Sequence, residues 1–336
     1  MRMRIWTGLV VVLALAAGIH VPALDAGSIA YWSAEDLTSG KAANLPFLTT
    51  THAFNVVRMA ASADRPAESH EGTTDVLFVV AGGGSVTAGG EIEKVATLKD
   101  MPGEMRGPSI KGGTAYELAP GATINIPPST PYRLQAGANG LVAMRLKINA
   151  GMHPWSIVST QQTTLQPAGV RAQDAVPLNV TQGGVVFWSA ESLHKAHATM
   201  KAAAAKGEST ADPRGLAAIP ATRTHAWNFL YRIMGPNGRP PGVEFHEGNT
   251  DIYFILDGTG TVMTEGTIEN REPFPNRPGE TRGTLITGGR GYKVKAGDVI
   301  NMPPSTPHQS LPDPGGFTYL LVKVNVGMYP WSLIDK

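Results

Sequence analysis

Short apolar runs that end at glycine recur along the chain. Residues 75–81 (DVLFVVA) and 251–256 (DIYFIL) are rich in β-branched and aromatic side chains, as buried strands are. Residues 291–297 (GYKVKAG) alternate polar and apolar positions instead, which predicts a half-buried strand. Residues 299–302 and 317–324 add two more apolar runs. Many short strands separated by Gly- and Pro-containing turns predict an all-β sandwich or barrel.

The same sequence pattern occurs twice, in the same order. Residues 31–37 (YWSAEDL) return as 187–193 (FWSAESL), and 125–131 (NIPPSTP) return as 301–307 (NMPPSTP). Three further pairs are 51–55 with 224–228, 102–107 with 278–283, and 147–156 with 323–332. Repetition over this distance predicts two domains of one architecture.

Each repeat opens on a predicted short helix, for which Ser33 and Ser189 are the expected N-caps. The second repeat is longer, and its extra residues fall within 194–219, which include the Ala-rich run 200–206. We expect a longer helix there, followed by a loop.

The first 26 residues are predicted to be a signal peptide. Arg2 and Arg4 precede an apolar run at 8–19 that is short for a membrane span, and small residues follow up to Ala26. An uncleaved membrane anchor is the alternative. The predicted domains are a signal peptide at 1–26, an N-terminal barrel at 27–160, a polar linker at 161–184 and a C-terminal barrel at 185–336. We therefore expect a periplasmic or secreted protein.

Charge and cysteine content exclude several classes of function. The 28 Lys and Arg residues nearly balance the 27 Asp and Glu residues, so nucleic acid is not an expected partner, nor is a membrane after signal cleavage. The chain has no Cys, which excludes disulfides, Cys metal ligands and Cys nucleophiles.

Two motifs of the second repeat resemble those of cupin proteins. The first consists of Glu244, His246, Asp251 and Gly258, and the second runs from 297 to a proline-rich turn and His308. With both repeats in register, the whole chain resembles a bicupin. The resemblance implies two tandem cupin barrels (double-stranded β-helix or jelly roll), each preceded by a short helix. It also shows two departures, because Glu244 stands where the family has a His and Asp251 where it has a Glu.

The chemistry of the second set favours one divalent transition metal. Residues 244 and 246 share one face of a strand, and we expect His308 to reach the same cavity from the opposite sheet. Two imidazoles with carboxylates suit Mn, Fe, Cu, Zn or Ni without selecting among them. We expect His246, Asp251 and His308 as ligands, and Glu244 as a ligand or a general base. The alternative is a metal-free pocket with hydrogen-bonded histidines.

The first repeat carries a weaker set: Glu68, His70, Asp75 and Tyr132. Tyr132 stands where the second repeat has His308, and a neutral Tyr is a poor metal ligand. We interpret these residues as a degenerate, structural site.

Four more residues of the second repeat are candidates for substrate binding: His225, Asn228, Arg282 and Tyr253. Arg282 could clamp a carboxylate, and Tyr253 could form an aromatic platform. For His225 a hydrogen-bonded structural role is the alternative, and for Arg282 an ion pair with the neighbouring Glu280.

The sequence therefore predicts an exported, metal-dependent oxidoreductase of dioxygenase type, acting on a small organic molecule. Alternatives are a cupin isomerase or decarboxylase, or a protein that binds a sugar, an organic acid or a metal without turnover. A homodimer is a further expectation. Fold resemblance alone does not choose among these activities.

Overall fold

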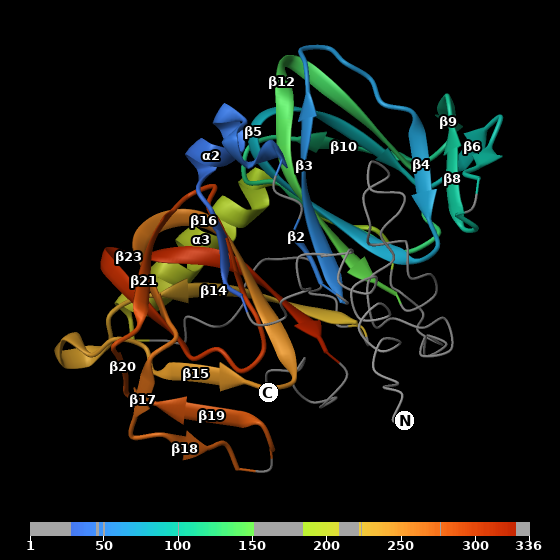
Figure 1. Cartoon of the computed structure of the whole chain (residues 1–336). Coiled ribbons are helices and arrows are strands. Elements are labelled where there is room, and N and C mark those ends of the chain that lie inside the picture. The colour runs from blue at the N-terminus through green and yellow to red at the C-terminus, as the bar shows by residue number, and fades with distance from the viewer. Residues whose placement is uncertain are drawn as a thin grey trace, which may run out of the picture.

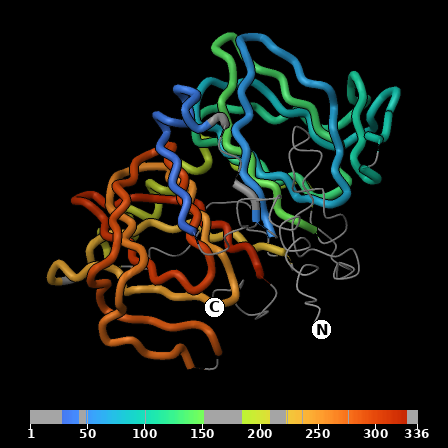
Figure 2. The backbone as a smooth tube through the Cα atoms, viewed as in Figure 1, coloured from blue at the N-terminus to red at the C-terminus, as the bar shows by residue number. Residues whose placement is uncertain are grey.

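The structure is a computed structural model, and it describes residues 28–44, 47–49, 51–99, 101–150, 184–207, 222, 224–275 and 277–326. Over these residues the chain forms two β-barrels, one from each repeat, which lie against each other (Figures 1 and 2). The predicted signal peptide lies outside the described residues, and so does the linker except for Gly184. The prediction of an all-β protein with two tandem cupin barrels is confirmed.

The N-terminal barrel is built from ten antiparallel strands. Their bounds are β2 (Phe47–Leu48), β3 (His52–Met59), β4 (Ala67–His70), β5 (Thr73–Ala88), β7 (Ala96–Thr97), β8 (Glu104–Gly107), β10 (Thr114–Leu118), β11 (Thr123–Ile126), β12 (Tyr132–Asn149) and β13 (Val186–Trp188). The order is β13-β11-β5-β12-β4-β8-β7, with β10 on β5, β3 on β12 and β2 on β3. A separate hairpin pairs β6 (Glu91–Glu93) with β9 (Ser109–Lys111).

The C-terminal barrel repeats this arrangement with nine strands. Their bounds are β1 (Ala30–Trp32), β14 (His225–Arg232), β15 (Val243–His246), β16 (Asn249–Thr264), β18 (Glu272–Pro273), β19 (Glu280–Gly283), β21 (Arg290–Lys295), β22 (Val299–Met302) and β23 (His308–Asn325). The order is β1-β22-β16-β23-β15-β19-β18, with β14 on β23 and β21 on β16. The corresponding hairpin pairs β17 (Thr267–Glu269) with β20 (Leu285–Thr287).

The opening strand of each repeat pairs with the barrel of the other repeat. Strand β1 lies antiparallel to β22, with Tyr31 opposite Ile300. Strand β13 lies antiparallel to β11, with Phe187 opposite Ile124. The predicted boundaries therefore separate the two repeats in sequence, whereas each sheet contains one strand from the other repeat.

Both opening helices begin at the predicted caps. In α2 (Ala34–Ser39) the side chain of Ser33 accepts a hydrogen bond from the Asp36 N–H, and Ser189 does the same for Ser192 in α3 (Ala190–Ala205). The second helix has 16 residues against 6 in the first, so the longer helix predicted there is confirmed. Most of the predicted loop after it lies outside the described residues. Two 3₁₀ turns complete the elements, at Lys41–Asn44 and Pro236–Gly238.

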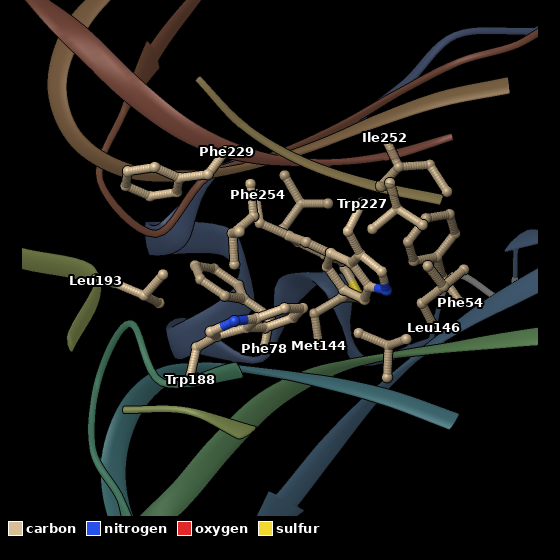
Figure 3. Packing of buried hydrophobic residues seen from close by; sticks show 14 of the residues in the cluster. Phe54, Phe78, Met144, Leu146, Trp188, Leu193, Trp227, Phe229, Ile252 and Phe254 are labelled. Atoms are coloured by element: carbon tan, nitrogen blue, oxygen red, sulfur yellow. The ribbon is translucent and has the colours of Figure 1, made fainter. Parts of the chain in front are cut away.

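A shared apolar core joins the two barrels (Figure 3). Phe78 stacks on Phe254 across the pseudo-symmetric contact, with ring centroids 5.0 Å apart, and Trp188 packs edge-on against Trp227 at 4.9 Å. Alternate residues on the same strands, such as Tyr253 and Ile255 of β16, belong to a second cluster inside the C-terminal barrel. The period-two alternation of strands thus supplies both cores.

Two buried histidines connect the barrels by hydrogen bonds. His52 Nε2 lies 2.9 Å from Asn301 Oδ1, and His225 Nε2 lies 3.0 Å from Asn125 Oδ1. Burial lowers the pKa of both histidines to about 4, so both rings are neutral at physiological pH.

Candidate metal centre

Three neighbouring strands bring Glu244, His246, Asp251 and His308 together inside the C-terminal barrel. Glu244 and His246 alternate on β15, Asp251 lies near the start of β16, and His308 is the first residue of β23. Glu244 and His308 are direct partners in the β15–β23 ladder. The expectation that His308 comes from the opposite sheet is therefore wrong, because the long strand β23 bends around the barrel and reaches β15.

The four donor atoms lie within 4.8 Å of one another. His308 Nε2 is 3.3 Å from Asp251 Oδ2 and 3.8 Å from Glu244 Oε2, while His246 Nε2 is 3.6 Å and 3.9 Å from the same two oxygens. The side chains of Asp251 and both histidines are buried, and that of Glu244 is 16% exposed. Among the described residues this is the group of His and carboxylate side chains that could hold a metal.

The other nitrogen of each imidazole is held by a hydrogen bond. Nδ1 of His246 donates to Glu280 Oε2, and Nδ1 of His308 donates to the Thr306 carbonyl at 3.0 Å. A carboxylate and a carbonyl accept hydrogen bonds, so both rings turn Nε2 toward the centre. Such contacts fix the tautomer and orientation of metal-binding histidines.

Unpaired buried atoms show that the residues fit a cation. Asp251 Oδ2 and His308 Nε2 are buried, and neither makes a hydrogen bond of acceptable geometry within the described part of the chain. Lone buried polar atoms are costly, and a metal ion would pair both. Two imidazoles and two carboxylates form the donor set of a divalent transition metal.

Three cationic side chains surround the carboxylates. Arg282 Nη1 donates to Glu244 Oε1, from which Arg232 Nη2 lies 3.5 Å away. Lys323 Nζ lies 3.4 Å from His246 Nε2 and 3.9 Å from Asp251 Oδ1. Burial would raise the pKa of Glu244, but Arg232 and the two histidines hold that pKa well below its usual range. The carboxylate is therefore ionised and available to a metal.

Neighbouring charges also shift the pKa values of His308 and Asp251. Burial by itself would lower the pKa of His308, but the carboxylates of Asp251 and Glu244, 3.3 Å and 3.8 Å from Nε2, raise it to about 9. Burial would raise the pKa of Asp251, but the charge of Lys323 and the neighbouring His246 lower it to about 2. In the absence of metal, His308 thus carries a proton between two carboxylates.

In the N-terminal barrel, Tyr132 and Arg145 pair with the carboxylates of the corresponding cluster. Tyr132 donates to Asp75 Oδ2 at 2.6 Å, and Arg145 Nη1 lies 3.1 Å from Glu68 Oε1 and 3.2 Å from the Tyr132 hydroxyl oxygen. His70 Nε2 lies 3.4 Å from that hydroxyl. Burial and the charge of Asp75 raise the pKa of Tyr132 well above 10, so it is a neutral phenol.

Two of the substrate-binding candidates lie beside the metal centre. The Tyr253 ring stacks on Tyr319 with centroids 4.0 Å apart and meets His308 edge-on at 6.3 Å, so it forms part of the wall. Arg282 reaches Glu244 directly, since the two are partners in the β15–β19 ladder. Glu280, the partner expected for Arg282 in the alternative prediction, contacts His246.

The other two candidates lie on opposite faces of β14. His225 points with Trp227 into the contact between the barrels, where it bonds Asn125, so the structure does not bring it to the metal centre. Asn228 has the opposite orientation, toward the barrel interior, and its Nδ2 is buried without a hydrogen-bond partner among the described residues. Arg232 lies on the same face, and alternation from Asn228 could have revealed it.

Comparisons with known proteins agree with the fold. No family model matches the chain, and no curated protein matches it. Among solved structures, salicylate 1,2-dioxygenase from Pseudaminobacter salicylatoxidans superposes with a TM-score of 0.51 and 13% identity, over 96% of this chain and 90% of that one. A mutant form of that enzyme in complex with gentisate gives 0.52 and 12%, over 95% and 87%. Oxalate decarboxylase from Lactobacillus farciminis gives 0.40 and 14%, over 82% and 78%.

The two superpositions with the dioxygenase support the fold alone, which is that of tandem cupin barrels. They do not establish a reaction. In the described part of the chain, neither helix has the length and apolar character needed to cross a membrane.

Proposed function

We propose that the protein is a metal-dependent oxidoreductase of dioxygenase type that acts on a small organic molecule. The observation that carries the proposal is the convergence of Glu244, His246, Asp251 and His308 on one buried point, where Asp251 Oδ2 and His308 Nε2 make no hydrogen bond of acceptable geometry with the described residues. The similarity in fold to a dioxygenase that has been crystallised with gentisate adds support.

The side chains around the centre have separate tasks in this proposal. His246, His308 and Asp251 hold the metal, which supplies Lewis-acid and redox chemistry when bound. Glu244 either completes the ligand set through Oε2 or accepts a proton there, while its Oε1 stays with Arg232 and Arg282. Tyr253 and Tyr319 provide an apolar wall against which a small ring or chain can lie.

We further propose that the protein is exported, as the apolar run at 8–19 and the small residues before Ala26 suggest. Determining the N-terminal residue of the mature protein tests this point. A mature chain that begins near residue 27 supports export with cleavage, and a retained Met1 contradicts cleavage.

Metal analysis of the purified protein tests the centre. We expect about one transition-metal ion per chain in the wild type, almost none in the His246→Ala/His308→Ala variant, and a full complement in Tyr132→Phe, which changes the equivalent of His308 in the other barrel. Retention of metal by the double histidine variant would contradict the assignment.

Activity is tested on the metal-loaded protein. Oxygen consumption and product formation are followed with a panel of small acids, phenols and sugars, using the double histidine variant as the control. Turnover that consumes O₂ supports the proposal. Turnover without O₂ uptake assigns a decarboxylase or isomerase, and binding without turnover assigns a binding protein.

A further inference from the structure

A cavity of about 400 Å³ opens on the outside of the C-terminal barrel, separate from the metal centre. Its walls include Phe245 of β15, Phe274 and three prolines. Phe245 alternates with Glu244 and His246 on β15, so the cavity lies on the opposite face of the strand from the metal ligands. Figure 1 shows β18 and β19, which flank the cavity, at the end of this barrel far from the N-terminal barrel. The volume is that of a small-molecule site.

The cavity carries cationic groups that lack ionic partners. The Arg271 guanidinium lies 4.4 Å from the Phe245 ring centroid, and that of Arg277 lies 4.7 Å from the Phe274 centroid. Neither makes a salt bridge with a carboxylate of the described residues, although Glu247 also lines the cavity. The other acidic residue of the lining, Glu280, contacts His246 with its carboxylate. Two guanidinium groups thus lie beside apolar walls, and neither is paired with a carboxylate of the described residues.

This chemistry is confined to the repeat with the complete ligand set. The residues of the first repeat that correspond to Phe245, Arg271, Phe274 and Arg277 are Ser69, Val95, Leu98 and Met101. At these four positions both the rings and the guanidinium groups are therefore missing from the barrel in which Tyr132 stands at the position of His308. Glu280, in contrast, has a counterpart in Glu104, which contacts His70 in the same way.

A tight turn joins the cavity to the metal centre. The Arg277 N–H donates to the Phe274 carbonyl, the Glu280 N–H donates to the Arg277 carbonyl, and the Phe274 N–H donates to the Glu280 carbonyl, all at 2.8–3.2 Å. A ligand that draws Arg277 inward would move the backbone that carries Glu280. Glu280 orients His246 through Oε2, and its Oε1 is buried without a hydrogen-bond partner in the described residues.

We propose that this cavity binds a small carboxylate with an apolar body, and that its occupancy alters metal affinity through Glu280. The guanidinium groups match the carboxylate, and the rings and prolines match the apolar body. The binding site stands by itself, whereas the link to metal affinity rests on the proposed metal centre.

Calorimetry with benzoate tests the binding site. We expect saturable binding of one benzoate by the wild type, about tenfold weaker binding by Arg277→Met, and much weaker binding of the neutral analogue benzyl alcohol. Lys99→Met, which removes a cation from the corresponding loop of the first repeat, is the matched control and should bind normally. The His246→Ala/His308→Ala variant should also bind normally, because the cavity does not use the barrel interior.

Three results would overturn the binding site: no saturable binding by the wild type, equal affinity in Arg277→Met, or loss of binding in the double histidine variant. The last would place benzoate in the barrel.

Zn²⁺ titration with and without saturating benzoate tests the link. We expect the wild-type Zn²⁺ affinity to change about fivefold and the benzoate affinity to change by the same factor when Zn²⁺ is bound, as linkage requires. In Glu280→Leu we expect benzoate to bind, but the ratio of Zn²⁺ affinities with and without benzoate should fall to about one. A wild-type factor of one overturns the link. A wild type with no Zn²⁺ affinity overturns the proposed metal centre and the link with it, whereas the benzoate result decides the cavity independently.

Discussion

At the residue scale, the contrast between Tyr132 and His308 separates the two clusters. Each is the first residue of the long strand that closes its barrel. The Tyr132 hydroxyl pairs with Asp75 and Arg145, and Arg145 corresponds to Leu321 in the second repeat, which has no charge. Arg145 thus links the Tyr132 hydroxyl to Glu68 in the first barrel. In the second barrel Arg232 and Arg282 contact Oε1 of Glu244, and its Oε2 faces the two histidines.

Replacing Tyr132 and Arg145 by their counterparts in the second repeat, His and Leu, should create a second metal site. We expect Tyr132→His/Arg145→Leu to bind a second Zn²⁺ per chain, because it completes the donor set of Glu68, His70 and Asp75 and removes the guanidinium that contacts Glu68 and the Tyr132 hydroxyl. Lys147 stays beside Asp75, as Lys323 does beside Asp251. Tyr132→His by itself should not bind a second Zn²⁺, since Arg145 stays within 3.1 Å of Glu68 Oε1. Metal counting by elemental analysis distinguishes the variants, and one Zn²⁺ per chain in the double variant would refute the explanation.

Proton competition at His308 predicts how metal affinity depends on pH. With a pKa of about 9 in the metal-free protein, His308 must lose a proton before Nε2 can bind a metal. Metal affinity should therefore rise by up to about tenfold per pH unit between pH 7 and pH 9 and level off above. Titration with a chromophoric competitor at several pH values measures it, and affinity that is independent of pH in this window would contradict the assignment.

The stability of the metal-free protein should respond in the opposite sense. The pKa of His308 is raised by folding, so its stabilising contribution is complete below about pH 6.5 and is lost as the pH rises through about 9. Urea unfolding at pH 6.5 and pH 9.5 should show a smaller free energy of unfolding at the higher pH. A His308→Asn variant should show a weaker dependence over the same interval, and an unchanged dependence would speak against this origin.

At the element scale, the barrels depend on long strands that bend. The β16–β23 ladder shifts register between Gly258 and Gly260, and Gly258 has a φ of 75°. A Cβ at Gly258 would lie 2.1 Å from the Gly316 carbonyl oxygen, so the close approach of the two strands needs glycine there. This explains why the motif glycine recurs at Gly82, with a φ of 70°.

Gly258→Ala should therefore lower the free energy of unfolding by more than the cost of placing an alanine in the left-handed backbone conformation. Gly288 is the matched control, because its φ is 69° and an alanine Cβ there would meet no atom within 4 Å. We expect a loss of about 1–2 kcal/mol for Gly288→Ala and at least about 3 kcal/mol for Gly258→Ala. Chemical denaturation measures both, and equal losses would show that the clash is relieved at no cost.

At the scale of the whole molecule, the exchanged strands make the two barrels interdependent. Strand β1 belongs to the first repeat but extends the sheet of the second, where Tyr31 also donates to Asp298 Oδ2 at 2.8 Å. Strand β13 does the converse. The shared core and the bonds His52–Asn301 and His225–Asn125 add to this contact.

We therefore expect the protein to unfold in one cooperative transition, and neither half to be stable alone. The C-terminal half expressed alone lacks β1, and it exposes the apolar surface that packs against Phe78 in the whole protein. Co-expression of residues 27–160 and 185–336 should restore a folded complex. Calorimetry and size-exclusion chromatography test this, and a C-terminal half that unfolds by itself at the wild-type temperature would contradict it.

Local sequence signals were sufficient for much of the fold and for the ligand set. Alternation and the repeated motifs predicted paired barrels, the capping residues Ser33 and Ser189 act as expected, and the spacing of Glu244, His246, Asp251 and His308 marks the residues that the structure brings together. These features depend on neighbours along one strand or one turn, and so they can be recognised in a single stretch of sequence.

Only the tertiary structure decided which strands lie side by side and what surrounds the ligands. Alternation indicates which residues share a face but not which strand faces them, so the sequence predicts the wrong sheet for His308 and leaves open a site or structural role for His225. Arg232 reaches Glu244 from β14, Lys323 lies opposite Asp251 in the β16–β23 ladder, and β1 and β13 pair across the repeats. Such contacts join residues far apart in sequence, and their free energy depends on packing that exists only in the folded molecule.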